Sequence, residues 1–112
     1  NFEIAAHLLT RVISKPDKNL ICLDLGHKSV AAENPLEKRV YFPEIETYKI
    51  ISQSEEHLVI ECPESDEFEI GQYLIGYPQH ICPTVALHSQ ANLIINNKIT
   101  SKSWQVTSRN RV

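Results

Sequence analysis

The 112-residue chain contains no methionine, one tryptophan and three glycines, and it lacks any long apolar run. No run approaches the roughly 20 apolar residues that a membrane-spanning helix needs. Residues 1–4 have neither the basic start nor the apolar centre of a signal peptide. We therefore expect a cytoplasmic protein without a membrane partner. Because methionine is absent, we also expect the chain to be a fragment of a longer protein.

An excess of positive charge is also missing. The formal net charge is -3, the isoelectric point is near 5.9, and the eleven Lys and Arg residues are scattered. Nucleic-acid surfaces are usually basic and often carry aromatic side chains among the charges. The composition therefore argues against nucleic acid as a partner.

Cysteine is scarce and its count is odd. Cys22, Cys62 and Cys82 do not form the even, closely spaced set that a secreted disulfide framework requires. Reduced thiols are the expectation for all three. We expect Cys22 and Cys62 to be buried and to behave as small hydrophobic residues.

The remaining composition is that of an ordinary globular domain, with 42% hydrophobic and 22% charged residues. Its length suffices for one domain with a core. Short apolar or alternating stretches separated by Pro, Gly and Asn turns predict an all-β fold, a single small β-barrel or sandwich-like domain over residues 1–112. Apolar or strand-like stretches are expected at residues 4–14, 20–23, 48–53, 57–61 and 99–106, with a turn at residues 96–97.

Two further features have a structural interpretation. A lone tryptophan at strand spacing usually fills the end of a barrel, so we expect Trp104 to pack in the core with Val106 on the same face. His7, His27 and His88 have no spacing that would bring them to a shared ion. We expect these histidines to lie at the surface or to form hydrogen bonds.

His80 and Cys82 are the candidate metal ligands. In an extended segment, residues i and i+2 project from the same face, so an imidazole and a thiol could converge on one ion. Two ligands indicate an open site, with positions left for water and substrate. Because Pro78 and Pro83 cannot donate to a sheet ladder, we expect the pair at a strand end or edge. The alternative is a hydrogen-bonded imidazole and a small apolar side chain in a buried strand.

Several short motifs stand in one order along nearly the whole chain. They are TRVIS at residues 10–14, LDLGHK at 23–28, SEEH at 54–57 and HICPTV at 80–85, followed by Trp104 and Arg109. In this order the sequence resembles the C-terminal β domain of the D-threonine aldolase and D-serine dehydratase family, whose members are similar to alanine racemase in fold type.

The resemblance implies a pyridoxal-phosphate lyase that acts on a β-hydroxy D-amino acid. It implies that the cofactor lysine lies in an N-terminal barrel domain absent from this chain, and that the full-length protein is a homodimer. It places a divalent ion on His80 and Cys82, where the thiolate favours zinc over a harder ion. The ion would act on the substrate β-hydroxyl, either in dehydration or in aldol cleavage. No catalytic residue is expected in this fragment, which alone would be inactive.

The resemblance leaves two side chains with an open role. Glu56 and His57 could line the pocket, or they could hydrogen-bond a metal ligand and so orient it. Alternatively, they could form a salt bridge at the surface of a turn. Lys28 follows a strand and a glycine, but the resemblance places the cofactor lysine in the other domain. We therefore predict that Lys28 does not bind pyridoxal phosphate.

A rival hypothesis is a non-catalytic β-barrel that binds a small ligand or a protein. It predicts His80 and Cys82 buried and bonded to the backbone, whereas the enzyme hypothesis predicts stoichiometric zinc, or an empty but paired His80 and Cys82 at the domain surface. A stand-alone metalloenzyme is disfavoured, because two ligands hold a divalent ion poorly and no nearby carboxylate completes a recognisable triad.

Overall fold

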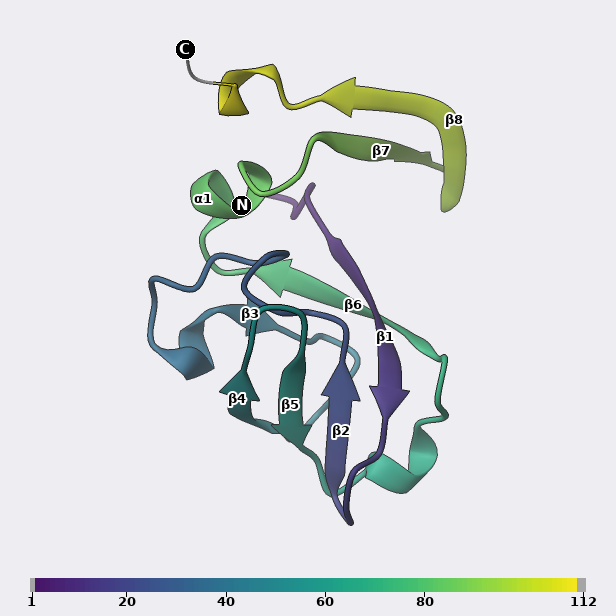
Figure 1. Cartoon of the computed structure of the whole chain (residues 1–112). Coiled ribbons are helices and arrows are strands. Elements are labelled where there is room, and N and C mark those ends of the chain that lie inside the picture. The colour runs from purple at the N-terminus through teal and green to yellow at the C-terminus, as the bar shows by residue number, and fades with distance from the viewer. Residues whose placement is uncertain (1, 111–112) are drawn as a thin grey trace.

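The computed structural model describes residues 2–110, and over that range most of the regular secondary structure is antiparallel strand (Figure 1). Six strands form one sheet in the order β3-β6-β1-β2-β5-β4, and β7 and β8 form a separate hairpin. The strands are β1 (Leu8–Ser14), β2 (Leu20–Leu23), β3 (Val40–Tyr41), β4 (Lys49–Gln53), β5 (Leu58–Glu61), β6 (Tyr73–Pro78), β7 (Gln90–Ile95) and β8 (Lys98–Gln105).

Helical structure is limited to single turns. One α-helical turn, α1, spans Ile81–Val85, and 3₁₀ turns span Leu36–Lys38, Ser65–Glu67 and Thr107–Arg109. No helix within residues 2–110 has the length and apolarity needed to cross a bilayer. The all-β prediction is confirmed, and the large sheet is a curled half-barrel.

The turns between strands follow the predicted chemistry. Asn19 adopts a φ of 63° in the β1–β2 turn, where the Leu20 amide donates to the Asp17 carbonyl at 3.1 Å. Asn96 and Asn97 have φ values of 52° and 61° between β7 and β8. Asparagine tolerates this left-handed conformation, and two such residues in succession make the tight turn favoured in hairpins.

Strand β1 holds the two halves of the sheet together because it changes partner along its length. Residues 8–11 pair with β6, and Val12 and Ser14 pair with β2 across a β-bulge. Asp24, directly after β2, secures this change: its Oδ1 accepts from the Thr10 hydroxyl and from the Arg11 amide, both at 2.6 Å. A carboxylate thus replaces strand pairing at the point where β1 leaves β2.

The core lies inside the curve of the sheet and is apolar. Phe42 is fully buried and meets the ring of Tyr48 edge-on at 5.4 Å between centroids, while the Tyr48 hydroxyl accepts from the Phe42 amide at 3.0 Å. Cys62 is buried as predicted, whereas Cys22 is only partly covered. The buried aliphatic side chains are Val12, Ile21, Leu23, Leu25, Val30, Val40, Ile45, Ile50, Leu58, Ile60 and Leu74.

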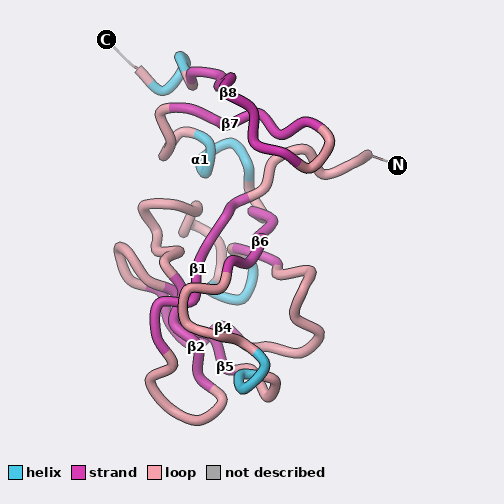
Figure 2. Tube along the Cα trace, turned by 90° about the vertical axis from the view of Figure 1, so that its right-hand side faces the viewer, coloured by secondary structure: helices cyan, strands magenta, loops and turns pink. Residues whose placement is uncertain are grey.

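Trp104 contradicts its prediction. It lies on β8 opposite Ala91 and is 70% exposed. The β7–β8 hairpin stands apart from the large sheet (Figures 1 and 2), so the side chains of β8 have no core of this domain to enter. Alternating spacing in the sequence identified the strand correctly, but it could not identify the sheet to which the strand belongs.

We predict that replacing Asp24 destabilises the domain through the Thr10 hydroxyl. Thr10 is 1% exposed, so Asp24→Ala leaves a buried donor without its acceptor, which costs about 1–3 kcal/mol. Asp24→Asn keeps an acceptor oxygen and should cost less. Urea unfolding followed by circular dichroism measures both, and Asp66→Ala, at an exposed carboxylate, is the control that should change little. Equal stability of Asp24→Ala and Asp66→Ala would contradict the prediction.

The same carboxylate should make stability depend on acid. Partial burial alone would raise the pKa of Asp24, but hydrogen bonds from the Thr10 hydroxyl and the Arg11 amide outweigh it and lower the pKa below 3.8. A lowered folded-state pKa stabilises the fold fully above the unfolded value and loses this effect as pH falls through the folded value. The stability gap between wild type and Asp24→Asn should therefore persist at neutral pH and close below about pH 3.8. A gap that does not narrow as the pH falls below this value would refute it.

Candidate metal centre

The loop after β2 leads to the candidate site, and backbone contacts fix its start. A Cβ on Gly26 would lie 2.1 Å from the carbonyl oxygen of Glu55, so only glycine permits this approach to the β4–β5 turn. The His27 amide donates to the Ser54 carbonyl at 2.9 Å, and the Lys28 amide donates to the Glu55 carbonyl at 3.1 Å. These contacts orient the following residues, 29–33, toward α1.

The segment that carries His80 and Cys82 is not a continuous strand. His80 is extended, with φ -127° and ψ 99°, and it precedes α1, whose first turn contains Cys82. The prediction that both residues project from one face of an extended segment is therefore wrong. Pro83 fits here because amides in the first helical turn need no intrahelical acceptor. The expected location beyond a strand end is confirmed, since β6 ends at Pro78.

Thr84 joins this segment to the loop after β2. Its hydroxyl, in a side chain that is 1% exposed, accepts from the Ala31 amide at 3.0 Å and donates to the His80 carbonyl at 2.8 Å. Nearby, His88 Nε2 bonds the Ser29 carbonyl at 2.8 Å. Two side chains from the α1 region therefore hold the backbone of residues 29–31.

Glu33, at the end of this loop, contacts His80. Its Oε1 bonds His80 Nδ1, and both side chains are about half exposed. A carboxylate can only accept, so Nδ1 carries the proton of this bond, and in the neutral ring Nε2 is then the acceptor nitrogen. A hydrogen bond from its own backbone amide, and after it the contact with His80, lower the pKa of Glu33 below its ordinary value. Glu33 is therefore ionised at neutral pH.

Cys82 is exposed, as is His80. An imidazole with a free Nε2 and an exposed thiol are donors that suit zinc, and a carboxylate on Nδ1 is a common partner of a metal-binding histidine. Among residues 2–110 no three or more His, Cys, Asp or Glu side chains converge on one point. The described residues therefore offer two candidate ligands, His80 and Cys82, and do not complete a metal site by themselves.

Glu56 and His57 lie in the β4–β5 turn, a different segment from the one that carries His80 and Cys82. Glu56 Oε1 accepts from Lys28 Nζ at 2.7 Å, and Glu55 Oε2 lies 3.4 Å from the same nitrogen. Glu56 is the main cause that raises the pKa of Lys28, which keeps this amine protonated. The turn-facing salt bridge weighed from the sequence is therefore present for Glu56, whereas the His57 amide bonds the Ser54 hydroxyl at 3.2 Å. The Lys28 ammonium is not a nucleophile.

The other histidines are at the surface or hydrogen-bonded, as predicted. His7 is exposed and bonds the Ile4 carbonyl at 3.1 Å, His27 is exposed, and His88 bonds Ser29. Sequence reasoning missed Glu33 and Thr84, which lie 47 residues from His80 and at the end of the HICPT motif, respectively. The Thr84 hydroxyl, next to the candidate ligands, was the one available indication.

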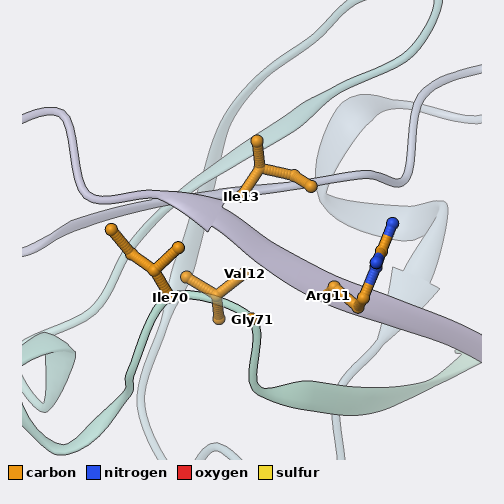
Figure 3. A pocket seen from close by; sticks show the side chains of 5 residues that line it. All are labelled: Arg11, Val12, Ile13, Ile70 and Gly71. Carbon is orange, nitrogen blue, oxygen red and sulfur yellow. The ribbon is translucent and has the colours of Figure 1, made fainter.

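A separate hollow lies at the bulge of β1 (Figure 3). Arg11, Val12, Ile13, Ile70 and Gly71 line it. It contains neither a metal-binding side chain nor a nucleophile, so it does not compete with His80 and Cys82 as the candidate site.

Comparison with known proteins places the chain in a family. The sequence model described as a putative serine dehydratase domain matches residues 5–94, which include both candidate ligands. The chain belongs to the serine dehydratase domain family. A D-threonine aldolase from Arthrobacter sp. is 29% identical over 109 residues, covering 96% of this chain and 28% of that protein.

Solved structures share the fold of this serine dehydratase domain. D-threonine aldolase from Filomicrobium marinum superposes with a TM-score of 0.83 and 20% identity over 97% of this chain and 29% of its own. D-threo-3-hydroxyaspartate dehydratase from Delftia sp. HT23 gives 0.69 and 17% over 88% of this chain and 31% of its own. Similar structures include its variants with a histidine, or a cysteine two positions later, replaced by alanine, the latter metal-free. The chain thus spans less than a third of these relatives' length.

We predict that Thr84→Val destabilises the domain although it preserves shape. Valine removes the acceptor of the buried Ala31 amide, which costs about 1–3 kcal/mol, whereas Thr84→Ser should retain most of the stability. Urea unfolding followed by circular dichroism measures both, with Thr107→Val, at an exposed threonine, as the control. If Thr84→Val and Thr107→Val unfold at the same urea concentration, the proposed link between the two segments contributes nothing.

Proposed function

We propose that this chain is the metal-binding β domain of a pyridoxal-phosphate-dependent D-amino-acid lyase, of the D-serine dehydratase or D-threonine aldolase kind. His80 Nε2 and Cys82 Sγ bind a divalent ion, with zinc favoured by the thiolate. The substrate is a β-hydroxy D-amino acid. The remaining ligands, the cofactor and its lysine belong to the part of the protein outside these 112 residues.

The observation that carries this proposal is the state of His80. Glu33 engages Nδ1 while the His80 side chain stays half exposed, and the Cys82 thiol two residues later is exposed as well. The rival hypothesis of a non-catalytic binding module called for a buried His80 and Cys82 bonded to backbone. The exposure of both side chains therefore favours the lyase.

The relatives support the same assignment. The family model spans residues 5–94. D-threo-3-hydroxyaspartate dehydratase has a histidine and a cysteine with the spacing of His80 and Cys82, and its variant with the cysteine replaced by alanine is described in a metal-free form. The aldolase from Arthrobacter sp. matches nearly the whole chain. Because this chain covers less than a third of each relative, the lyase activity is proposed for the full-length protein.

The residues of this chain have defined roles in this function. His80 and Cys82 would hold the ion, and Glu33 would keep the His80 proton on Nδ1 so that Nε2 faces the ion. The bound ion supplies Lewis acidity toward the β-hydroxyl of the substrate. Pyridoxal phosphate supplies the electron sink for bond breaking at Cα. Two protein ligands leave coordination positions open for that hydroxyl and for water.

We predict that His80→Ala and Cys82→Ser in the full-length protein each abolish stoichiometric zinc binding and metal-dependent turnover of D-serine or D-threonine. Each variant removes one of the two donors that this domain supplies. Elemental analysis after gel filtration measures the zinc, and turnover with and without a chelator measures its role. His27→Ala, at an exposed histidine outside the site, should retain its zinc.

Two results would overturn the proposal. One is full zinc content in both His80→Ala and Cys82→Ser, since the ion would then bind elsewhere. The other is turnover of D-serine or D-threonine that neither a chelator nor these substitutions reduce. A protein that binds zinc through this pair and converts neither amino acid would contradict the assigned substrate class alone.

A further inference from the structure

We propose that Glu33 is a positioning residue for the metal centre, fixing the ring of His80 so that Nε2 points to the ion. This inference rests on the proposed function, because it assigns a role at the same site. Glu33 itself does not bind the ion in this proposal. Its contribution is made through His80.

Glu33 and His80 are in direct contact. Glu33 Oε1 and His80 Nδ1 join segments 47 residues apart in the sequence, so no local backbone geometry imposes the contact. Because the carboxylate accepts from Nδ1–H, it selects one tautomer and limits rotation of the ring. A negative charge at this position also makes Nε2 a better donor to a cation.

The loop that carries Glu33 is fixed to the segment that carries His80. Thr84 and His88 hold the backbone at Ala31 and Ser29, close before Glu33 in the chain. On the other side, Arg39 Nε donates to the Asn34 carbonyl at 2.9 Å and attracts the Glu33 carboxylate. The loop is therefore anchored on both sides of Glu33, which restricts where its carboxylate can lie.

The competing explanation is an ordinary surface ion pair. Such pairs contribute little, since water solvates both partners and the side chains lose freedom. A pair of that kind would not change the affinity of an ion on Nε2, whereas a positioning carboxylate would. Metal affinity measured separately from stability therefore distinguishes the two.

The test uses the full-length protein and zinc alone, with competition against a chromophoric chelator to obtain Kd. Loss of an outer carboxylate behind a metal-binding histidine weakens affinity by about 10- to 100-fold. We expect a loss in this range for Glu33→Ala and a smaller one for Glu33→Gln, which can still accept from Nδ1–H. Glu37→Gln, at an exposed glutamate four positions along the same loop, is the matched control and should leave Kd unchanged.

Thermal unfolding of the metal-free protein separates positioning from folding. We expect the metal-free midpoint of Glu33→Ala to match that of Glu37→Gln, while added zinc raises it less than in wild type. Glu33→Ala could instead lower the unfolding midpoint of the metal-free protein by enough to account for its weaker zinc binding. Glu33 would then be a structural residue, and the inference would be overturned. Zinc affinity of Glu33→Ala equal to that of Glu37→Gln would also overturn it.

His80→Ala identifies which proposal has failed. If His80→Ala loses zinc and Glu33→Ala does not, His80 is a ligand and only the role of Glu33 is wrong. If both variants bind zinc like the wild type, the ion is held elsewhere and the proposed function fails together with the inference.

Discussion

A buried hydroxyl sets the position of the candidate site. Thr84 accepts from the Ala31 amide and donates to the His80 carbonyl, so one side chain bonds the backbone of both segments that form the site. A hydroxyl is the smallest side-chain group that can accept and donate at once. Without it, the loop carrying Glu33 and the turn carrying Cys82 would be joined by the half-buried His88 and by exposed side chains.

The sheet encloses the apolar core of the domain, and the segments beyond its strand ends carry the candidate ligands. The inside of the curved sheet is filled by aliphatic side chains with Phe42 among them, and its buried polar residues are few. The candidate ligands lie beyond the end of β6, with His80 in extended conformation and Cys82 in the single turn α1, and Thr84 bonds this segment to Ala31. A rigid sheet that presents chemically active loops is a common arrangement, because loops can expose polar side chains that a core cannot.

Much of the fold could be predicted from the sequence because its information is local. The strand pair 48–53 and 57–61 and the turn at residues 96–97 follow from side-chain periodicity and backbone preferences. The helical turn at Ile81–Val85 was missed because five residues are too few to show a repeating helical pattern of apolar side chains. Its Thr84 hydroxyl also bonds the amide of Ala31, which is distant in the sequence. Glu33 could not have been identified either, since its contact with His80 joins segments 47 residues apart.

Because Trp104 is exposed, its fluorescence reports on the β7–β8 hairpin and not on the core. It is the single tryptophan of the chain, and it lies on a hairpin that stands apart from the curved sheet. Its indole is already solvated in the folded domain, so its fluorescence carries little information about melting of the core. The same property makes it an intrinsic sensor for the hairpin: a blue shift of the emission of this 112-residue chain would mark the burial of β8 against another surface.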